Sequence, residues 1–209
     1  MSATDHPVAV VVPIKGFHQA KDRLAPRLDT AARRELALAM AATLLAAADP
    51  LPVFVACDDT DVAEWAEAHH AVPLWIPARG LNEAVTGAVA ALRDRGVTTA
   101  IIAHSDLPLA SALDHLVDPE HHESEVVLVP DRHNDGTNVI VTPTHRPPAF
   151  AYGPGSFHRH LHHSIVVGHN ARVVRDPELG WDIDHPADLD LPGGASILDI
   201  VFSKRATTS

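Results

Sequence analysis

The 209-residue chain contains a single cysteine, Cys57, so no disulfide can form within it. A chain that relies on no disulfide is typical of a reducing compartment, and we expect a cytoplasmic protein. Cys57 ends an apolar run, where the simplest role for its side chain is that of a small core residue.

Positive charge is also scarce, because 16 Lys and Arg face 27 Asp and Glu and the formal net charge is −11. Such a chain is poorly suited to the phosphate backbone of nucleic acid or to an anionic membrane, so we expect neither as a partner. Long apolar runs are lacking as well: the Ala-rich stretch 36–48 is shorter than the roughly 20 residues that a membrane span needs. No signal peptide is apparent. A cluster of cations in this chain is therefore informative.

Short apolar runs alternate with helix-forming segments along the chain. This alternation predicts an α/β fold, with a mostly parallel mixed sheet flanked by helices, in one domain over residues 1–209. We expect the residues from Ser203 onward to be frayed, and short helices to begin at Pro108 and Pro186. The expected strands are 8–13, 53–57, 72–76, 98–103, 126–130, 138–142 and 172–174, and the longer helices are 30–48, 58–70, 80–96 and 157–164.

The run of Val and Ala that begins at Val8 ends at Pro13 and is followed by Lys15, Lys21 and Arg23. In open α/β sheets, ligands bind beyond the carboxyl ends of the strands. Cations at that edge predict a site for the phosphates of a nucleotide. The alternative is a solvated basic loop.

Carboxylates follow other expected strands. Asp106 comes directly after the run 98–103, and Asp182 and Asp184 would face the same way in an extended segment. Repulsion between such carboxylates is relieved by a hard cation such as Mg²⁺, which prefers oxygen ligands. The alternatives are a helix cap for Asp106 and a surface turn for the other two.

Two glycine-containing segments are candidate anion sites, because glycine lets backbone N–H groups approach a phosphate. They are Gly136-Thr137-Asn138 and Gly153-Pro154-Gly155-Ser156. His160 follows the second segment by one helical turn and is expected to face the same pocket. Asn82 is expected either to contact a base edge or to cap a helix. The other histidines lack the Cys partners or HExxH pattern of a zinc site, so most are interpreted as surface residues.

Six segments carry a resemblance to a known family: VVPIKGFHQAKDRLAP, GLNEAV, HSDLP, PDRHNDGTN, YGPGSFHRH and DIDHPADL. They occur in the order seen in the guanylyltransferases of deazaflavin coenzyme F-420 biosynthesis, which the chain resembles over residues 8–189. The combination of PDRHNDGTN and YGPGSF is the most specific part. The resemblance implies a Rossmann-like nucleotidyltransferase fold similar to that of the molybdenum-cofactor guanylyltransferases.

The implied reaction joins GMP from GTP to the phosphate of a three-carbon acid and releases pyrophosphate. The implied acid is phosphoenolpyruvate, with 2-phospho-L-lactate and 3-phospho-D-glycerate as alternatives. The resemblance also implies two Mg²⁺ ions and a downstream transferase that uses the product, and it is compatible with a homodimer. By motif matching, the nucleotide positions are Lys15, Lys21, Arg23 and Asn82, the metal positions are Asp106, Asp182 and Asp184, the acid positions are Thr137, Gly153, Ser156 and His160, and the catalytic group is Lys21, Arg23 and Asp106.

Two other functions stay open on the sequence. One is a nucleotidyltransferase for a sugar phosphate or for the molybdenum cofactor. The other is a non-catalytic, histidine-rich metal-binding or regulatory module that kept the fold.

Overall fold

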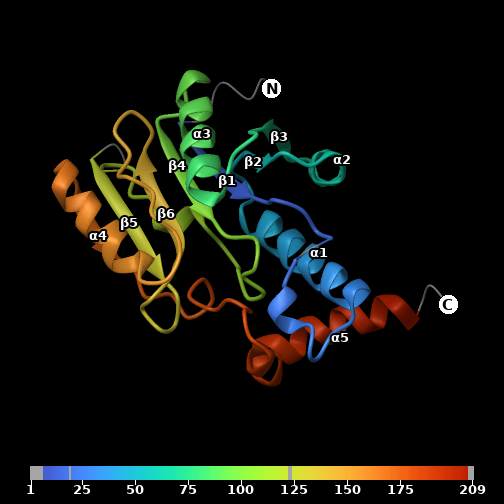
Figure 1. Cartoon of the computed structure of the whole chain (residues 1–209). Helices are drawn as coiled ribbons and strands as arrows, with labels where there is room; N and C mark the ends of the chain where they lie inside the picture. Colours follow the sequence, from blue (N-terminus) through green and yellow to red (C-terminus); the bar gives the residue numbers. More distant parts are fainter. Residues whose placement is uncertain (1–6, 19, 122–123, 207–209) are drawn as a thin grey trace.

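The structure is a computed structural model that describes residues 7–18, 20–121 and 124–206. It contains a seven-stranded sheet in the order β3-β2-β1-β4-β6-β5-β7, with helices packed on both faces (Figure 1). The strands are β1 (Val8–Pro13), β2 (Val53–Cys57), β3 (Val72–Trp75), β4 (Thr99–Ala103), β5 (Glu125–Pro130), β6 (Thr137–Pro143) and β7 (Asn170–Val173). The helices are α1 (Thr30–Ala47), α2 (Thr60–Ala68), α3 (Leu81–Asp94), α4 (Ser156–Val167) and α5 (Pro192–Ala206), with short 3-10 helices η1 (Asp22–Leu24), η2 (Asp114–Leu116) and η3 (Pro186–Asp190).

The sheet is mixed but mostly parallel, which confirms the predicted fold class. β1 pairs in parallel with both β2 and β4, β2 with β3, and β5 with β7. β6 runs antiparallel to both β4 and β5. The chain runs from β1 outward to β2 and β3 and then returns to β4 on the other side of β1. Such a switch point is where ligands bind in open α/β sheets.

β1 lies inside the sheet between β2 and β4 and is buried on both faces, as its unbroken Val and Ala run predicted. Val10 and Val12 pack with α1 and α2 on one face, while Ala9 and Val11 pack with α3 on the other. α4 covers the second face further along the sheet through Phe157.

Asp residues cap the first two helices. The Asp29 carboxylate accepts a hydrogen bond from the Ala32 N–H at 2.7 Å, and Asp59 accepts one from the Val62 N–H at 3.1 Å. Such caps satisfy N–H groups that have no partner within the helix. Each cap lies immediately before the first helical Thr.

The expected helix at Pro108 is wrong. The chain makes a turn at residues 108–109 and then runs irregularly to η2. Leu107, Leu113 and Leu116 are all fully buried in the core between the sheet and α1. That spacing follows the core surface rather than one face of a regular helix, so tertiary packing overrides the local propensity.

The C-terminal segment also differs from the expectation, because α5 continues through residues 203–206 instead of fraying from Ser203. Ile197 and Val201 of α5 are buried with Leu36 and Met40 of α1 in a third apolar cluster. This packing stabilises a helix that starts with Pro and two glycines. The last three residues lie outside the described part of the chain.

Candidate active site

Two adjoining cavities open at the carboxyl ends of β1 and β4. The first, here called the Lys21 cavity, has a volume of about 480 Å³ and is lined by Lys15, Lys21 and Arg23, among others. The second, called the Asp182 cavity, has a volume of about 740 Å³ and is lined by loops from β5, β6, α4 and η3. Arg23, Asp106 and Asp184 line both. The structure thus brings the predicted cations and carboxylates to one place.

Lys21 joins the two cavities through its ammonium group. Its Nζ atom donates to Asp106 Oδ2 at 2.6 Å and to Asp184 Oδ1 at 2.9 Å. Burial alone would lower the pKa of Lys21, but the two carboxylates outweigh it and raise the pKa to about 12. Lys21 also has a φ of 57°, a backbone conformation that costs energy for residues other than glycine. The loop therefore holds this charged ammonium group in place.

Asp106 follows β4 with one oxygen paired and one free. Burial acts to raise its pKa, but the Lys21 ammonium and His104 lower it overall. The second oxygen, Oδ1, is buried and has no hydrogen-bond partner among the described residues. The neighbouring His104 has a pKa lowered by burial, and its Nε2 also lacks a partner there. Two buried polar atoms without partners therefore belong to residues that line the Asp182 cavity.

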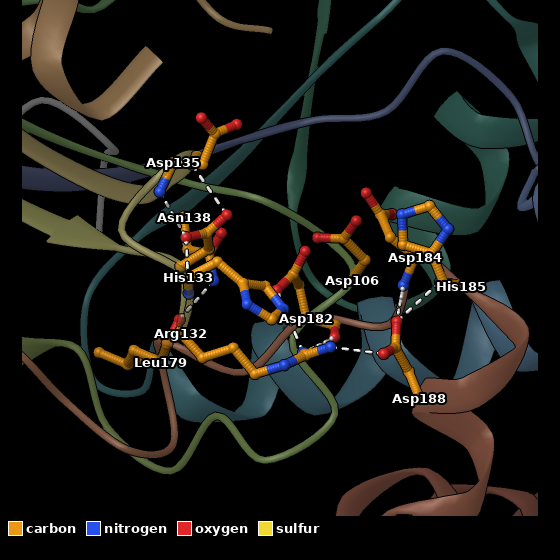
Figure 2. A network of polar contacts seen from close by, with 12 residues as sticks. Asp106, Arg132, His133, Asp135, Asn138, Leu179, Asp182, Asp184, His185 and Asp188 are labelled. Atoms are coloured by element: carbon orange, nitrogen blue, oxygen red, sulfur yellow. Dashed lines mark hydrogen bonds and ion pairs between the residues drawn. The ribbon is translucent and has the colours of Figure 1, made fainter. Parts of the chain in front are cut away.

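Asp182 and Asp184 do not pair with the same cation. Asp182 lies 3.6 Å from the Arg132 guanidinium, whereas Asp184 pairs with Lys21 and, at 3.5 Å, with Arg23. Burial and then the nearby Asp106 and Asp184 carboxylates raise the pKa of Asp182 to about 6. Figure 2 shows these carboxylates gathered around the centre of the site. The Arg132 guanidinium therefore does not compensate for the burial of Asp182 and for the two neighbouring carboxylates.

Arg132 and Asp188 support this group, and the sequence analysis missed both. Arg132 donates to the Asp182 carbonyl at 2.8 Å and is paired with Asp188 (Figure 2). Asp188 accepts hydrogen bonds from the N–H groups of Asp184 and His185. The usable signal was the His185-Pro-Ala-Asp188 spacing, which is that of a capping box.

The charge of the Asp182 cavity indicates a need for cations. Its lining carries two guanidinium groups, Arg23 and Arg132, against six carboxylates, those of Asp106, Asp131, Asp135, Asp182, Asp184 and Asp188. In the described part of the chain no three His, Cys, Asp or Glu side chains converge as a ready metal site. However, the donors are carboxylate oxygens and Asp106 Oδ1 is buried without a partner, so the residues fit a hard cation such as Mg²⁺.

Thr137 and Ser156 line the Asp182 cavity, and His160 lies behind them. His160 is fully buried, and its Nδ1 lies 3.0 Å from Thr137 Oγ1. Its Nε2 lies 2.8 Å from the Ala151 N–H, a donor, so Nε2 must accept and the proton must be on Nδ1. Nδ1 then donates to Thr137 Oγ1, as Ser156 Oγ also does at 3.3 Å. The Thr137 hydroxyl proton is left free to point into the cavity.

Burial lowers the pKa of His160 to about 4, with a smaller contribution from His163 and Arg159. The imidazole is therefore neutral at pH 7. His160 does not line the cavity that the sequence led us to expect it to face, and its influence there passes through Thr137.

The loop 151–155 is held by Arg159, a third residue that sequence reasoning missed. Its guanidinium donates to the carbonyls of Ala151, Gly153 and Pro154. Gly153 has a φ of +116°, a backbone angle that residues other than glycine rarely adopt. A Cβ at Gly153 would meet nothing closer than Arg159 at 3.9 Å, so the requirement for glycine is conformational rather than steric.

The start of α4 offers fewer free N–H groups than expected. The Ser156 N–H donates to the Gly153 carbonyl at 2.9 Å, and the Phe157 N–H donates to the Asp135 carbonyl at 3.0 Å. These bonds fix the loop rather than bind a ligand. The Thr137 hydroxyl, which Ser156 and His160 orient, is therefore the better candidate for a contact to an anion.

A third cavity of about 260 Å³, called the Asp58 cavity, adjoins the Lys21 cavity and shares Pro13, Ile14 and Lys15 with it. Asn82 lines neither. Its amide oxygen accepts a hydrogen bond from the Tyr152 N–H at 2.7 Å, and thereby ties α3 to the loop before α4.

The fold and the paired cavities are those of an open α/β protein with a ligand site at the carboxyl ends of its strands. Among solved structures, the chain is similar to a chain described as a nucleotide-diphospho-sugar transferase from Desulfovibrio desulfuricans G20, with a TM-score of 0.71, 13% identity, and coverage of 94% of this chain and 98% of that one. It is also similar to a 4-diphosphocytidyl-2C-methyl-D-erythritol synthase from Anaerococcus prevotii, with a TM-score of 0.60, 9% identity, and coverage of 91% and 97%. At these identities the likeness shows the fold alone.

Sequence comparison then places the chain within one family. Residues 8–191 match the family model described as "Guanylyl transferase CofC like", and the chain belongs to this family. It is 38% identical to the phosphoenolpyruvate guanylyltransferase of Sphaerobacter thermophilus, over 90% of this chain and 93% of that protein. It is 34% identical to the protein of the same name from Conexibacter woesei, over 93% and 89%. The chain is therefore a nucleotidyltransferase enzyme, which confirms the resemblance.

None of the helices in the described residues is both long enough and apolar enough to span a membrane.

Proposed function

We propose that this enzyme transfers GMP from GTP to the phosphate of phosphoenolpyruvate, forming enolpyruvyl-2-diphospho-5'-guanosine and pyrophosphate. The observation that carries the proposal is the meeting of two cavities at Arg23, Asp106 and Asp184, with Lys21 paired to both of these carboxylates. Two phosphate-bearing substrates can occupy the two cavities with their phosphates at this junction. Relatives named phosphoenolpyruvate guanylyltransferase support the choice of acid and nucleotide.

In the reaction, a phosphate oxygen of the acid attacks the α-phosphorus of GTP, and the bond from that phosphorus to the bridging oxygen of pyrophosphate breaks. Lys15, Lys21 and Arg23 line the Lys21 cavity and hold the triphosphate. The two ammonium groups act as point charges, and the Arg23 guanidinium offers a planar fork to phosphate oxygens. No side-chain nucleophile is needed, because positioning and neutralisation of charge lower the barrier.

Asp106, Asp182 and Asp184 would hold Mg²⁺, two ions in our proposal, and the bound metal would neutralise the charge of both phosphates. The acid lies in the Asp182 cavity, where the Thr137 hydroxyl donates to its anionic oxygens and the Ser156 hydroxyl, through its bond to Thr137 Oγ1, orients that donor. Lys21 remains protonated throughout, because its raised pKa lies far above neutral pH.

We place the reaction in the cytoplasm, in the biosynthesis of coenzyme F-420. The product carries a diphosphate bridge that a further transferase can cleave as it moves the acid onto an acceptor. Gly153 and the Thr137 hydroxyl could bind any of the three related phosphoacids. The assay below therefore compares the three acids as substrates.

The test is a pyrophosphate-release assay that combines GTP, ATP or CTP with phosphoenolpyruvate, 2-phospho-L-lactate or 3-phospho-D-glycerate, in the presence of Mg²⁺ and of the transferase that consumes the product. We expect turnover with GTP and phosphoenolpyruvate. Release of pyrophosphate with a sugar phosphate or a pterin phosphate, and not with any three-carbon acid, would overturn the proposal.

A further inference from the structure

The Asp58 cavity lies beyond the carboxyl ends of β1 and β2 and against the start of α3. Most of its lining is apolar, with Ile14, Ile76 and Leu81 among the larger side chains. It shares Lys15 with the Lys21 cavity, so a ligand with phosphates at Lys21 can extend its other end here. An apolar slot that continues a phosphate site suits a flat nucleobase.

Three polar or charged side chains line this cavity: Lys15, Cys57 and Asp58. Lys15 belongs equally to the Lys21 cavity. Cys57 is buried, and burial raises the pKa of its thiol, so it stays uncharged. Asp58 is therefore the strong hydrogen-bond acceptor among the side chains of this lining.

The two adjacent aspartates at the end of β2 have different uses. Asp59 caps α2 through the Val62 N–H, which is a structural role. Asp58 is exposed, and its carboxylate has no hydrogen-bond or ion-pair partner among residues 7–18, 20–121 and 124–206. It is thus available to a ligand in the cavity that it lines.

We propose that Asp58 selects guanine by accepting hydrogen bonds from the N1–H and the 2-amino group of the base. These two donors lie side by side on guanine, and a carboxylate matches them with its two oxygens. Adenine presents an unprotonated N1 at the same edge, so its lone pair would face the carboxylate. Loss of a matched polar contact discriminates strongly, because the polar groups are then left unpaired.

The distribution of charge also orients the nucleotide. The Asp58 carboxylate repels phosphates, whereas Lys21 and Arg23 attract them at the other end of the connected cavities. The base therefore lies toward Asp58 and the α-phosphate toward Asp106. This inference rests on the proposed use of GTP.

The experiment varies the side chain at position 58 and the base of the nucleotide together, as in a double-mutant cycle. Binding of GTP, ITP, XTP and ATP is measured by calorimetry without the acid, for the parent enzyme, Asp58→Ala and Asp58→Asn. ITP lacks the 2-amino group, so the parent should bind GTP more tightly than ITP, and Asp58→Ala should abolish that difference. Loss of a charge-assisted contact predicts a rise in the Kd for GTP of roughly 10- to 100-fold.

Asp58→Asn should weaken GTP and improve XTP, because the new amide can donate to the 2-oxo group of xanthine. Asp61→Asn is the matched control: Asp61 lies in the first turn of α2, pairs with His18 at 3.0 Å and lines none of the three cavities. Its affinities should change less than twofold.

An equal loss of GTP and ITP in Asp58→Ala, or no preference for GTP over ITP in the parent, would overturn the assignment of Asp58. A parent enzyme that binds and turns over ATP or CTP in place of GTP would instead overturn the proposed function. The two failures are therefore distinguishable.

Discussion

The two sides of the site are built differently. On the β1–β3 side, a parallel region, the Lys21 and Asp58 cavities are formed mainly by the ends of strands and the loop after β1. On the β4–β7 side, which contains the antiparallel strands, the Asp182 cavity is formed by loops that are cross-linked by Asp131, Arg132, Asp188 and Arg159. The first side offers an open cationic approach, whereas the second is a carboxylate-rich cavity with a fixed shape.

This difference indicates a division of labour. A triphosphate can be held by cations in many arrangements, because each of these arrangements neutralises its charge. A small acid must be recognised by a few hydroxyl groups at fixed positions, so the loops around it carry many internal hydrogen bonds. Substitutions on one side should therefore leave affinity for the other substrate intact, whereas substitutions at the junction should affect both.

The largest effect is expected at the junction. Asp106→Asn removes a carboxylate that positions the Lys21 ammonium at 2.6 Å and that would hold Mg²⁺ in our proposal, so both phosphates lose neutralising charge. We expect kcat to fall by about 10³-fold, on the order of 4 kcal/mol, measured by pyrophosphate release at saturating substrates. The control is Asp190→Asn, because Asp190 pairs with Arg27 on the exposed surface. Near-parental turnover in Asp106→Asn would show that the junction of the two cavities is not where the reaction takes place.

The second prediction concerns stability on the acid side. The pKa of His160 in the fold, about 4, lies below the ordinary value of 6.5, so the unfolded chain binds more protons between these values. The stabilising contribution of neutral His160 is therefore present above pH 6.5 and is lost as the pH falls through 4, by up to about 3 kcal/mol.

His160→Asn should flatten the fall in unfolding free energy between pH 6.5 and 4, as measured by urea denaturation at several pH values. Asn also keeps a donor near the position of Nδ1, so it should retain more of the affinity for the acid than His160→Leu. If both variants showed the parental pH dependence, the imidazole would not be the buried neutral base described here.

The third prediction separates the two sides. Gly153→Val places a valine where the backbone φ is +116°, and the resulting strain should displace the loop that lines the Asp182 cavity. We expect the KM for the acid to rise at least tenfold and the KM for GTP to stay within twofold. Gly96→Val is the matched control, because Gly96 has a φ of +85°, open space around it and lines none of the three cavities. A folded Gly153→Val enzyme that lost GTP affinity instead would place the acid elsewhere.

The smallest effect is expected for Ser156→Ala. The hydroxyl is removed while the backbone bond from Ser156 to Gly153 and the Thr137 donor are kept. The KM for the acid should rise by the equivalent of about 1 kcal/mol, or roughly fivefold, with no change in the KM for GTP. An effect as large as that of Gly153→Val would show that Ser156, rather than the loop as a whole, dominates recognition of the acid.

Sequence reasoning identified the charged residues that line the cavities better than the residues that hold the surrounding loops in place. Lys15, Lys21, Arg23 and Asp106 were recognisable because polar residues directly after buried strands must gather at one edge of the sheet. Arg132, Arg159 and Asp188 were missed, because each acts on backbone groups or partners whose proximity arises only in the fold. The same reason explains Asn82 and His160, which were noticed as polar residues but contact other parts of the protein rather than line a cavity.

The sequence by itself determined the α/β class, the placing of cations and carboxylates directly after buried strands and the residue types at the site, because these follow from local periodicity and from what comes after each apolar run. The tertiary structure decided which groups meet: Lys21 with Asp106 and Asp184, Asp182 with Arg132, and His160 with Thr137. Those pairs are separated by between 23 and 163 residues in the chain. Their protonation depends on burial and on neighbouring charge, and both are properties of the packed protein rather than of any segment.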